Sequence, residues 1–534
     1  MTDFIASRIP YRSTAAFSKT VLDYIDQDNA IKPFFAYPVS IAGIQKAVED
    51  RKAFPYDRKA LVNELQKQYA GIQQHDKVRK NIELLLAENT FTITTAHQNN
   101  IFTGPLYFIY KIIHAIKLAD QLKPVLPDYN FVPVFYIGSE DADLDELNHI
   151  WLGGEKLVWE TKQTGAVGRM KIGKELLKLV DRMEGQLSVL PNGNEIISMF
   201  SESYTEGTSI QDATFTFVNN LFAEYGLVVL LPDNAVLKKQ MLPIFKDDLL
   251  HQAASGIVEK TASKLEEAGY KVQANPREIN LFYLKDDIRE RIEMVNDTYF
   301  VHNTSFKFSE TEMLEELQNH PEHFSPNVIL RGLYQEMILP NVAFIGGGGE
   351  TAYWLQLKEL FDHYKVPFPV LILRNSFLLA EKKWLEKIKK TGFKTEDFFS
   401  DEQDLMNRLV LNESENNVKL NGSLSEIENL YETFRKQAVR IDATLEKHVE
   451  SLRSKTITRL HELEKKMLRA EKRKFSDRQQ QIHAIKEHLF PGQGLQERKD
   501  NFSYYYAKWG KGFIKKLYDN SLTFEQEFVL LEEK

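Results

Sequence analysis

The sequence predicts an α/β protein, with a Rossmann-like core of parallel strands, two inserted segments and an α-helical coiled-coil domain. Between about residues 90 and 375, short apolar runs alternate with longer helical patterns, which is typical of a parallel sheet with helices on both faces. Two stretches inside this region instead alternate β-like runs with polar turns. From Ser423 to Leu489 there is neither proline nor glycine, and apolar residues recur at steps of three and four, as in a coiled coil.

The composition is that of an ordinary globular protein. Of the 534 residues, 43% are hydrophobic and 27% are charged, and the net charge of −8 argues against general binding to nucleic acid or to anionic membranes. We find no signal peptide and no apolar run long enough to span a membrane. The absence of cysteine excludes disulfides, thiolate metal sites and a cysteine nucleophile, and it fits a cytoplasmic protein.

The elements of the core are expected in the following order. Residues 1–90 are mainly helical, with loops at Asp28–Ser40 and Phe54–Asp57. Five strands follow, at Phe91–Thr94, Phe131–Gly138, Gly226–Leu231, Val342–Ile345 and Pro369–Leu373. A long helix is predicted after the first strand, at about Leu106–Leu122, and another before the third strand, at about Ser209–Tyr225.

These elements imply an organisation into seven consecutive segments. They are N-terminal helices with the first half of the core (1–150), a first inserted segment (151–205), a continuation of the core (206–274), a second inserted segment (275–325), the second half of the core (326–385), the coiled-coil domain (386–490) and a C-terminal segment that packs on the core (491–534).

The coiled-coil seam predicts how this domain associates. It runs through Leu424, Ile427, Tyr431, Phe434, Ala438, Ile441 and Leu445, continues at His448 and Leu452, and then shifts by four residues to Leu460, Leu463, Met467 and Ala470. The shift indicates either a stutter in one long helix or a reversal into an antiparallel hairpin, for which Asp442–Ala443–Thr444 offers a helix cap. A hairpin would cover only part of the apolar stripe, so we expect a homodimer through this region.

Three polar junctions follow predicted strands and are expected to open onto one cleft, because ligands of open α/β sheets bind beyond the carboxyl ends of the strands. The first junction, residues 95–104, precedes a helix start at Pro105 and contains His97, Gln98, Asn99, Thr103 and Gly104. Free amides and the helix dipole there favour a phosphate or carboxylate, and His97 could donate a hydrogen bond to a phosphate in a transition state. The alternative is a connecting loop with capping residues.

The second junction is acidic. It contains Glu140, Asp141, Asp143, Asp145 and Glu146, followed by Asn148 and His149. These carboxylates repel one another unless a divalent metal, an amine or a hydroxyl-rich sugar lies among them. The alternative is an acidic helix N-terminus. Because no His-x-x-x-His or similar spacing accompanies this junction, no dedicated metal is predicted.

The third junction is rich in glycine. Gly346, Gly347, Gly348 and Gly349 precede a helix that carries Glu350, Tyr353, Trp354 and Gln356. Four glycines allow the backbone to approach a ligand closely, although the stretch matches neither the P-loop nor the full dinucleotide fingerprint. The alternative is a tight strand–helix turn, with the helix residues divided between packing and lining.

A fourth feature is basic and predicts a second nucleotide or anion site. Arg469, Lys472, Arg473 and Lys474 precede the loop LFPGQGLQER at 489–498. The residues expected in this second site are Arg473, Phe490, Gly494, Gln496 and Arg498. The alternative is a solvated helix face followed by a turn.

Five blocks in the same order resemble the BshC family, the cysteine-adding ligases of bacillithiol biosynthesis. They are TGPLYFIYKIIHAIKLA, EDADLDELNH, FSPNVILRGLYQEMILPNVAFIGGGGETAYWLQLK, LEKKMLRAEKRK and LFPGQGLQER. The resemblance implies a Rossmann-type core related to nucleotidylyl transferases and class I aminoacyl-tRNA synthetases, with two inserted segments and a coiled coil. It also implies the addition of L-cysteine to glucosaminyl-malate, the last step to bacillithiol.

The sequence departs from the family pattern at each junction. Thr95–Ala96–His97–Gln98 stands where T-G-Q-Q is common, and Ser139–Glu140–Asp141–Ala142–Asp143 stands where G-E-D-H-D is common. Gly347–Gly348–Gly349–Glu350 replaces glycine–proline–glycine–glutamate. Ala142 stands where the family pattern has a histidine, so no side chain at 142 can take the role of that histidine. His97 could partly replace it.

We therefore expect a ligase that activates the cysteine carboxylate with ATP or another nucleotide, accompanied by Mg²⁺. The expected catalytic residues are His97, Glu140, Asp141 and Asp143, with Glu140 or Asp141 as the general base on the attacking amine. Two other classes stay open: a coiled-coil scaffold that binds a nucleotide without turnover, and an enzyme like a class I aminoacyl-tRNA synthetase. The second is disfavoured because the chain has no K-M-S-K-S-like run and no basic anticodon-binding domain.

Overall fold

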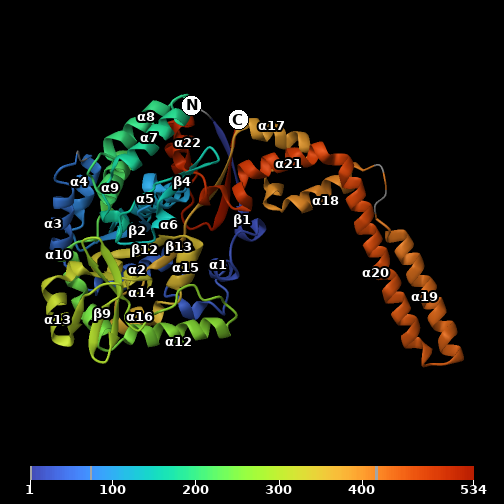
Figure 1. The fold of residues 1–534 in the computed structure, drawn as a ribbon, viewed down its shortest axis with the longest axis horizontal. Coiled ribbons are helices and arrows are strands. Elements are labelled where there is room, and N and C mark those ends of the chain that lie inside the picture. The colour runs from blue at the N-terminus through green and yellow to red at the C-terminus, as the bar shows by residue number, and fades with distance from the viewer. Residues whose placement is uncertain (1–2, 73–74, 415, 417–418) are drawn as a thin grey trace. The chain divides into compact units, whose positions relative to one another are not determined.

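The chain divides into two compact units. The computed structural model describes residues 3–72, 75–414, 416 and 419–534 (Figure 1). The first unit comprises Met1–Leu379, Leu495–Glu532 and Lys534, and the second comprises Ala380–Gly494 with Glu533. The range 386–490 expected for the coiled-coil domain falls inside the second unit, and the seven-segment division stays a prediction.

A five-stranded parallel sheet forms the centre of the first unit, and it contains all five strands predicted for the core. Its order is β13-β12-β2-β3-β6, with β2 at Thr90–Gln98, β3 at Asn130–Gly138, β6 at Val228–Leu230, β12 at Asn341–Gly346 and β13 at Val370–Leu373. All neighbouring strands pair in parallel. Counted along the chain, the order is 5-4-1-2-3, which is that of a Rossmann fold with its switch point between β2 and β12.

Helices cover both faces of this sheet (Figure 1). On one face, α2 (Ile41–Lys52) and α5 (Tyr107–Val125) pack on Ile93, Ile345 and Ile372. Intervening strand residues such as Phe344 and Leu371 belong to a second apolar cluster on the opposite face, with α9 (Ile210–Phe222), α14 (Val328–Ile338) and α15 (Gly348–Trp354). Side chains that alternate between two buried faces explain why most of these strands appear as nearly continuous apolar runs, whereas β2 buries threonines between its apolar residues.

Both predicted inserted segments have their own substructure. The first contains a hairpin of β4 (His149–Leu152) and β5 (Glu155–Val158), then α7 (Lys174–Leu187) and α8 (Gly193–Ser203). The second is an antiparallel sheet, in the order β10-β9-β8-β7-β11, with α13 (Glu310–Asn319). Its strands are β7 (Leu281–Lys285), β8 (Ile288–Val295), β9 (Thr298–Val301), β10 (Lys307–Ser309) and β11 (Phe324–Pro326).

The N-terminal region is helical as predicted, except at its start. Its helices are α1 (Lys19–Ile25), α3 (Arg58–Gln68) and α4 (Asp76–Leu84), besides α2. Phe4–Pro10, however, forms β1, which pairs with β15 (Glu527–Glu533), itself paired with β14 (Ser376–Ala380). The C-terminal segment also supplies α22 (Phe502–Trp509) and α23 (Lys511–Asn520).

The second unit is helical, and its coiled coil is an antiparallel hairpin rather than one continuous helix. It comprises α17 (Lys382–Thr391), α18 (Glu402–Glu413), α19 (Asn421–Ile441), α20 (Leu445–Lys472) and α21 (Ser476–Leu489). The Tyr431 hydroxyl of α19 lies 2.7 Å from the Thr456 hydroxyl of α20, and Arg435 pairs with Glu446 at 2.6 Å. Phe434 and Ile441 remain 44% and 82% exposed on this hairpin.

A helix must be both long and apolar to cross a bilayer, and the helices of the described residues differ in both respects. None of them is both long and apolar enough to cross a membrane.

Candidate functional site

A cavity of about 360 Å³ lies at the carboxyl ends of β2 and β3, beside α15. β2 borders the switch point of the sheet and α15 follows β12 on its other side, so the cavity adjoins the place where Rossmann-like folds bind their ligands. Its lining includes members of all three predicted junctions, namely His97 and Gln98, Glu140 and Asp141, and Glu350 and Tyr353. The three junctions therefore converge on one cavity.

His97, at the end of β2, offers a hydrogen-bond donor to this cavity. Its Nδ1 accepts a hydrogen bond from the Gln98 amide at 2.9 Å, which leaves the proton of the neutral ring on Nε2. Burial, together with the charges of Lys111, Arg374 and Arg331, holds the pKa of His97 well below its ordinary value. Nε2 is buried and has no partner among the described residues. His97 is therefore a neutral N–H donor that a ligand oxygen could satisfy.

Glu140, just beyond β3, belongs to a buried network of alternating charges. Its carboxylate forms an ion pair with the buried Lys238, and the Ser325 hydroxyl donates to it at 3.0 Å. Lys238 also lies 3.2 Å from Asp233, which Arg169 contacts at 2.6 and 2.8 Å. Burial raises the pKa of Glu140, and Lys238 opposes that shift. The cation that the crowded carboxylates require is thus, for Glu140, a lysine of the protein itself.

The rest of the acidic junction divides between the cavity and a helix cap. Asp141 lines the cavity, and Gln98 donates to its Oδ2 at 2.7 Å. Asp143 is exposed and caps the short helix α6 (Leu144–Leu147), accepting from the Glu146 amide at 3.4 Å. The alternative interpretation, an acidic helix N-terminus, therefore describes Asp143 and its successors, whereas the cavity receives Glu140 and Asp141.

Two arginines give the cavity a positive wall. Arg289 of β8 and Arg331 of α14 both line it, and neither has an ion-pair partner among the described residues. Arg289 donates to the Ser325 hydroxyl at 3.2 Å, and Arg331 donates to the Tyr353 hydroxyl. Burial lowers the pKa of Arg289 while Asp141 and Glu140 oppose that shift. Guanidinium groups in this setting suit a carboxylate or phosphate ligand.

The glycine-rich junction contributes through its helix rather than through its glycines. Glu350 accepts from the Gly347 amide at 2.8 Å and forms an ion pair with the buried Lys111 at 2.5 Å. None of the glycines at 346–349 lines the cavity, and none has a positive φ. A Cβ on Gly348 would lie 3.4 Å from Val21, so this glycine faces α1. The junction is a tight strand–helix turn that presents Glu350 and Tyr353.

Several residues expected at the site lie elsewhere. Thr103 and Gly104 have positive φ values in a turn whose Gly104 carbonyl accepts from Asn501 at 2.6 Å, and the Leu106 amide at the start of α5 donates to the Asp500 carbonyl. That helix end is therefore covered by the C-terminal segment. The others outside the cavity lining, several of them buried, are Asn99, Asn148, His149, Trp354 and Gln356.

The sequence interpretation missed Lys238, Arg169, Asp233, Arg289 and Arg331. They come from helices, loops and the second inserted segment, and no local motif marks them. Arg331 does lie within FSPNVILRGLYQEMILPNVAFIGGGGETAYWLQLK, one of the five blocks that resemble the family, and this is the signal that could have identified it.

The residues of the predicted second site are divided between the two units. In the second unit, a cavity of about 510 Å³ is lined by Phe490, Lys472 and Lys486, with Asp401, Glu402 and Glu487 among its other residues. Arg473 and Gly494 are exposed and do not line it. In the first unit, Gln496 is buried and bonds to the backbone of Leu379, while Arg498 is exposed. A nucleotide at this second position stays a prediction.

Comparisons with known proteins match nearly the whole chain. The family model "Bacillithiol biosynthesis BshC, N-terminal Rossmann-like domain" matches residues 5–375, and "Bacillithiol biosynthesis BshC, C-terminal coiled-coil domain" matches residues 377–533. A relative from Flavobacterium psychrophilum is 41% identical over 98% of this chain and 99% of its own. One from Flavobacterium johnsoniae is 40% identical with the same coverage, and both are named "Putative cysteine ligase BshC".

Proposed function

The chain belongs to the BshC family of bacillithiol biosynthesis and is a ligase, and on this premise we propose that it joins the carboxylate of L-cysteine to the amine of glucosaminyl-malate. We propose further that a nucleotide, with Mg²⁺, activates the carboxylate, because an amide does not form favourably from a free carboxylate and an amine in water. ATP is the first candidate for this nucleotide.

The observation that carries this proposal is the set of hydrogen-bond donors in the cavity beside the switch point. Glu140 is paired with Lys238 and Glu350 with Lys111, so the positive wall of Arg289 and Arg331 is left for a ligand. The malate part of the acceptor carries two carboxylates, and guanidinium groups bind carboxylates in two-point contacts. The volume of about 360 Å³ is within the range of small-molecule sites.

The chemistry divides into an activation and a transfer. In the first step, a cysteine carboxylate oxygen attacks a phosphorus of the nucleotide, and either pyrophosphate or the nucleoside diphosphate leaves. In the second, the glucosamine nitrogen attacks the activated carbonyl carbon, the amide bond forms, and the phosphate-containing group leaves. The Nε2–H of His97 is a fixed donor suited to the negative charge that develops on oxygen in either step.

Glu140 is our candidate for the group that removes the proton from the attacking amine. Burial raises the pKa of Glu140, and a base with a pKa nearer neutrality removes a proton more effectively at neutral pH. Lys238 keeps this buried carboxylate charged and oriented. Asp141, held by Gln98, would position the amine as a second carboxylate.

The proposal is tested by mass spectrometry of purified protein incubated with cysteine, glucosaminyl-malate, ATP and Mg²⁺, with AMP and ADP quantified. We expect bacillithiol, together with one nucleotide product in equal amount. Arg289→Met should raise the KM for glucosaminyl-malate about 10–100-fold, as expected for a lost hydrogen bond to a charged group. The control is Arg291→Met on the same strand, because Arg291 is exposed and does not line the cavity. Nucleotide binding without product would favour the scaffold alternative.

A further inference from the structure

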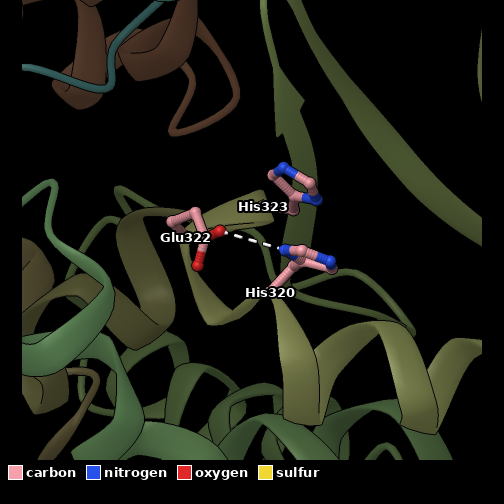
Figure 2. Close-up of side chains that lie close together, drawn as sticks. All are labelled: His320, Glu322 and His323. Atoms are coloured by element: carbon pink, nitrogen blue, oxygen red, sulfur yellow. Dashed lines mark hydrogen bonds and ion pairs between the residues drawn. The ribbon is translucent and has the colours of Figure 1, made fainter.

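A turn at the end of α13 brings two histidines and a glutamate together, away from the residues that line the cavity. One ring nitrogen of His320, one of His323 and one carboxylate oxygen of Glu322 lie within 4.8 Å of one another. Figure 2 shows Glu322 directed toward His320, with His323 above it. Nδ1 of His320 lies 3.2 Å from Oε1 of Glu322.

The local sequence His-Pro-Glu-His explains this geometry. His320 is the C-cap residue that follows α13, and Pro321 begins a 3-10 turn at Pro321–His323. The His323 amide donates to the His320 carbonyl at 2.9 Å, and the turn closed by this bond brings the side chains at 320 and 323 close together. Their rings stack with centroids 4.9 Å apart and an angle of 18° between their planes.

A further carboxylate orients one of the two rings. Nδ1 of His323 lies 2.6 Å from Oε1 of Glu316, and Glu316 also accepts from the Tyr283 hydroxyl at 2.7 Å. With its Nδ1–H donated to Glu316, His323 presents the lone pair of Nε2. A carboxylate that holds the far side of an imidazole is the usual support of a histidine that ligates a metal.

We propose that His320, Glu322 and His323 bind a divalent transition-metal ion of the zinc class. Two imidazoles with one carboxylate suit Zn²⁺, Ni²⁺ or Co²⁺, whereas Mg²⁺ and Ca²⁺ prefer ligand sets made of oxygen. Ligands at zinc lie about 2.0–2.2 Å from the ion, so the three groups must move closer together. The His320 side chain is 51% exposed and Glu322 is partly exposed, so both are able to rotate inward. Water would complete the coordination.

A metal bound at this turn would also affect the wall of the cavity. The Glu322 carbonyl accepts from Nζ of Lys238 at 3.2 Å, and Lys238 is the partner of Glu140. β11 follows the turn directly, and its Ser325 donates to Glu140. A bound ion would therefore brace the segment that forms one wall of the cavity. The metal proposal rests on the turn alone and does not depend on the ligase reaction.

Zinc titration of tag-free, chelator-treated full-length protein tests the proposal, with a chromophoric chelator as competitor. The chain has 13 histidines, so the binding site must be located as well as measured. We expect one tight Zn²⁺ equivalent in the wild type and its loss in His320→Ala. The matched control is His302→Ala, because His302 is 50% exposed and faces one carboxylate, Glu290, without a second histidine.

Two further measurements separate a lost ligand from a disturbed fold. Glu316→Gln should weaken Zn²⁺ binding about 10–100-fold, as is usual when the group supporting a ligand histidine is removed. Hydrogen exchange of the wild type should slow at residues 320–326 when Zn²⁺ is added. The proposal is overturned if His320→Ala binds Zn²⁺ as tightly as the wild type, if the wild type binds no equivalent, or if the protection appears elsewhere in the chain.

Discussion

Replacement of Lys238 by methionine tests the charge network behind the candidate site. Lys238 is fully buried, and its Nζ serves Glu140, Asp233 and a backbone carbonyl. Methionine fills much the same volume but leaves Glu140 buried without its cation. Removal of one partner from a buried ion pair costs about 3–5 kcal/mol. Because Arg169 still holds Asp233 through two contacts, we expect the lower end of that range.

The same variant should change the pH dependence of the reaction. Lys238 opposes the rise that burial produces in the pKa of Glu140. Without Lys238 the pKa of Glu140 rises further, so the acid limb of the kcat/KM profile should move to higher pH. A variant that was merely less stable would keep the position of that limb.

Urea unfolding of the first unit, followed by tryptophan fluorescence, measures the stability change. The double variant Lys238→Met with Glu140→Gln removes both charges and should recover at least about 1 kcal/mol relative to Lys238→Met alone. Lys239→Met is the control, because that neighbouring lysine is exposed. Equal stabilities of the single and double variants, within about 0.5 kcal/mol, would refute the network as described.

Three other predictions concern the site, the assembly and the pH dependence of stability. Glu140→Gln and Asp141→Asn should abolish bacillithiol formation without unfolding the chain; normal turnover with unchanged melting would remove them from the mechanism. We expect a homodimer through the coiled coil, and the double variant Phe434→Asp with Ile441→Asp should be a monomer in light scattering. The reason is that each of these exposed apolar side chains would contribute about 1.5–3 kcal/mol when buried in an interface. A monomeric wild type would rule out this interface. Burial raises the pKa of Asp248 from 3.8 to about 7. The stabilisation that Asp248 contributes is therefore complete below pH 3.8 and is lost as the pH rises through 7. In Asp248→Asn the melting temperature should fall less over that pH interval than in the wild type. An equal fall in both proteins would contradict this assignment.

The sequence alone determined the sheet and its helices. Residues of β3, β6, β12 and β13 are largely apolar over runs too short for helices, and β2 is rich in β-branched threonine, because both faces of this parallel sheet are buried. The sequence also predicted that its polar junctions meet at one edge of the sheet, since the carboxyl ends of parallel strands share that edge, and members of all three line one cavity. The seam between Leu424 and Ala470 predicted a coiled coil but allowed two arrangements, and only the contacts between α19 and α20 selected the hairpin.

Only the tertiary structure shows which charged side chains pair at the candidate site and that Phe4–Pro10 forms a strand. Phe4–Pro10 becomes β1 because it pairs with β15, more than 500 residues away in the chain, and no local pattern carries that information. Glu140 precedes Lys238 by about a hundred positions, so their pairing is visible only in space. The glycines at 346–349 suggested a close approach to a ligand, yet they serve a tight turn. Local sequence fixes which backbone shapes are favourable, whereas partners in a buried charge network are fixed by which elements the fold packs together.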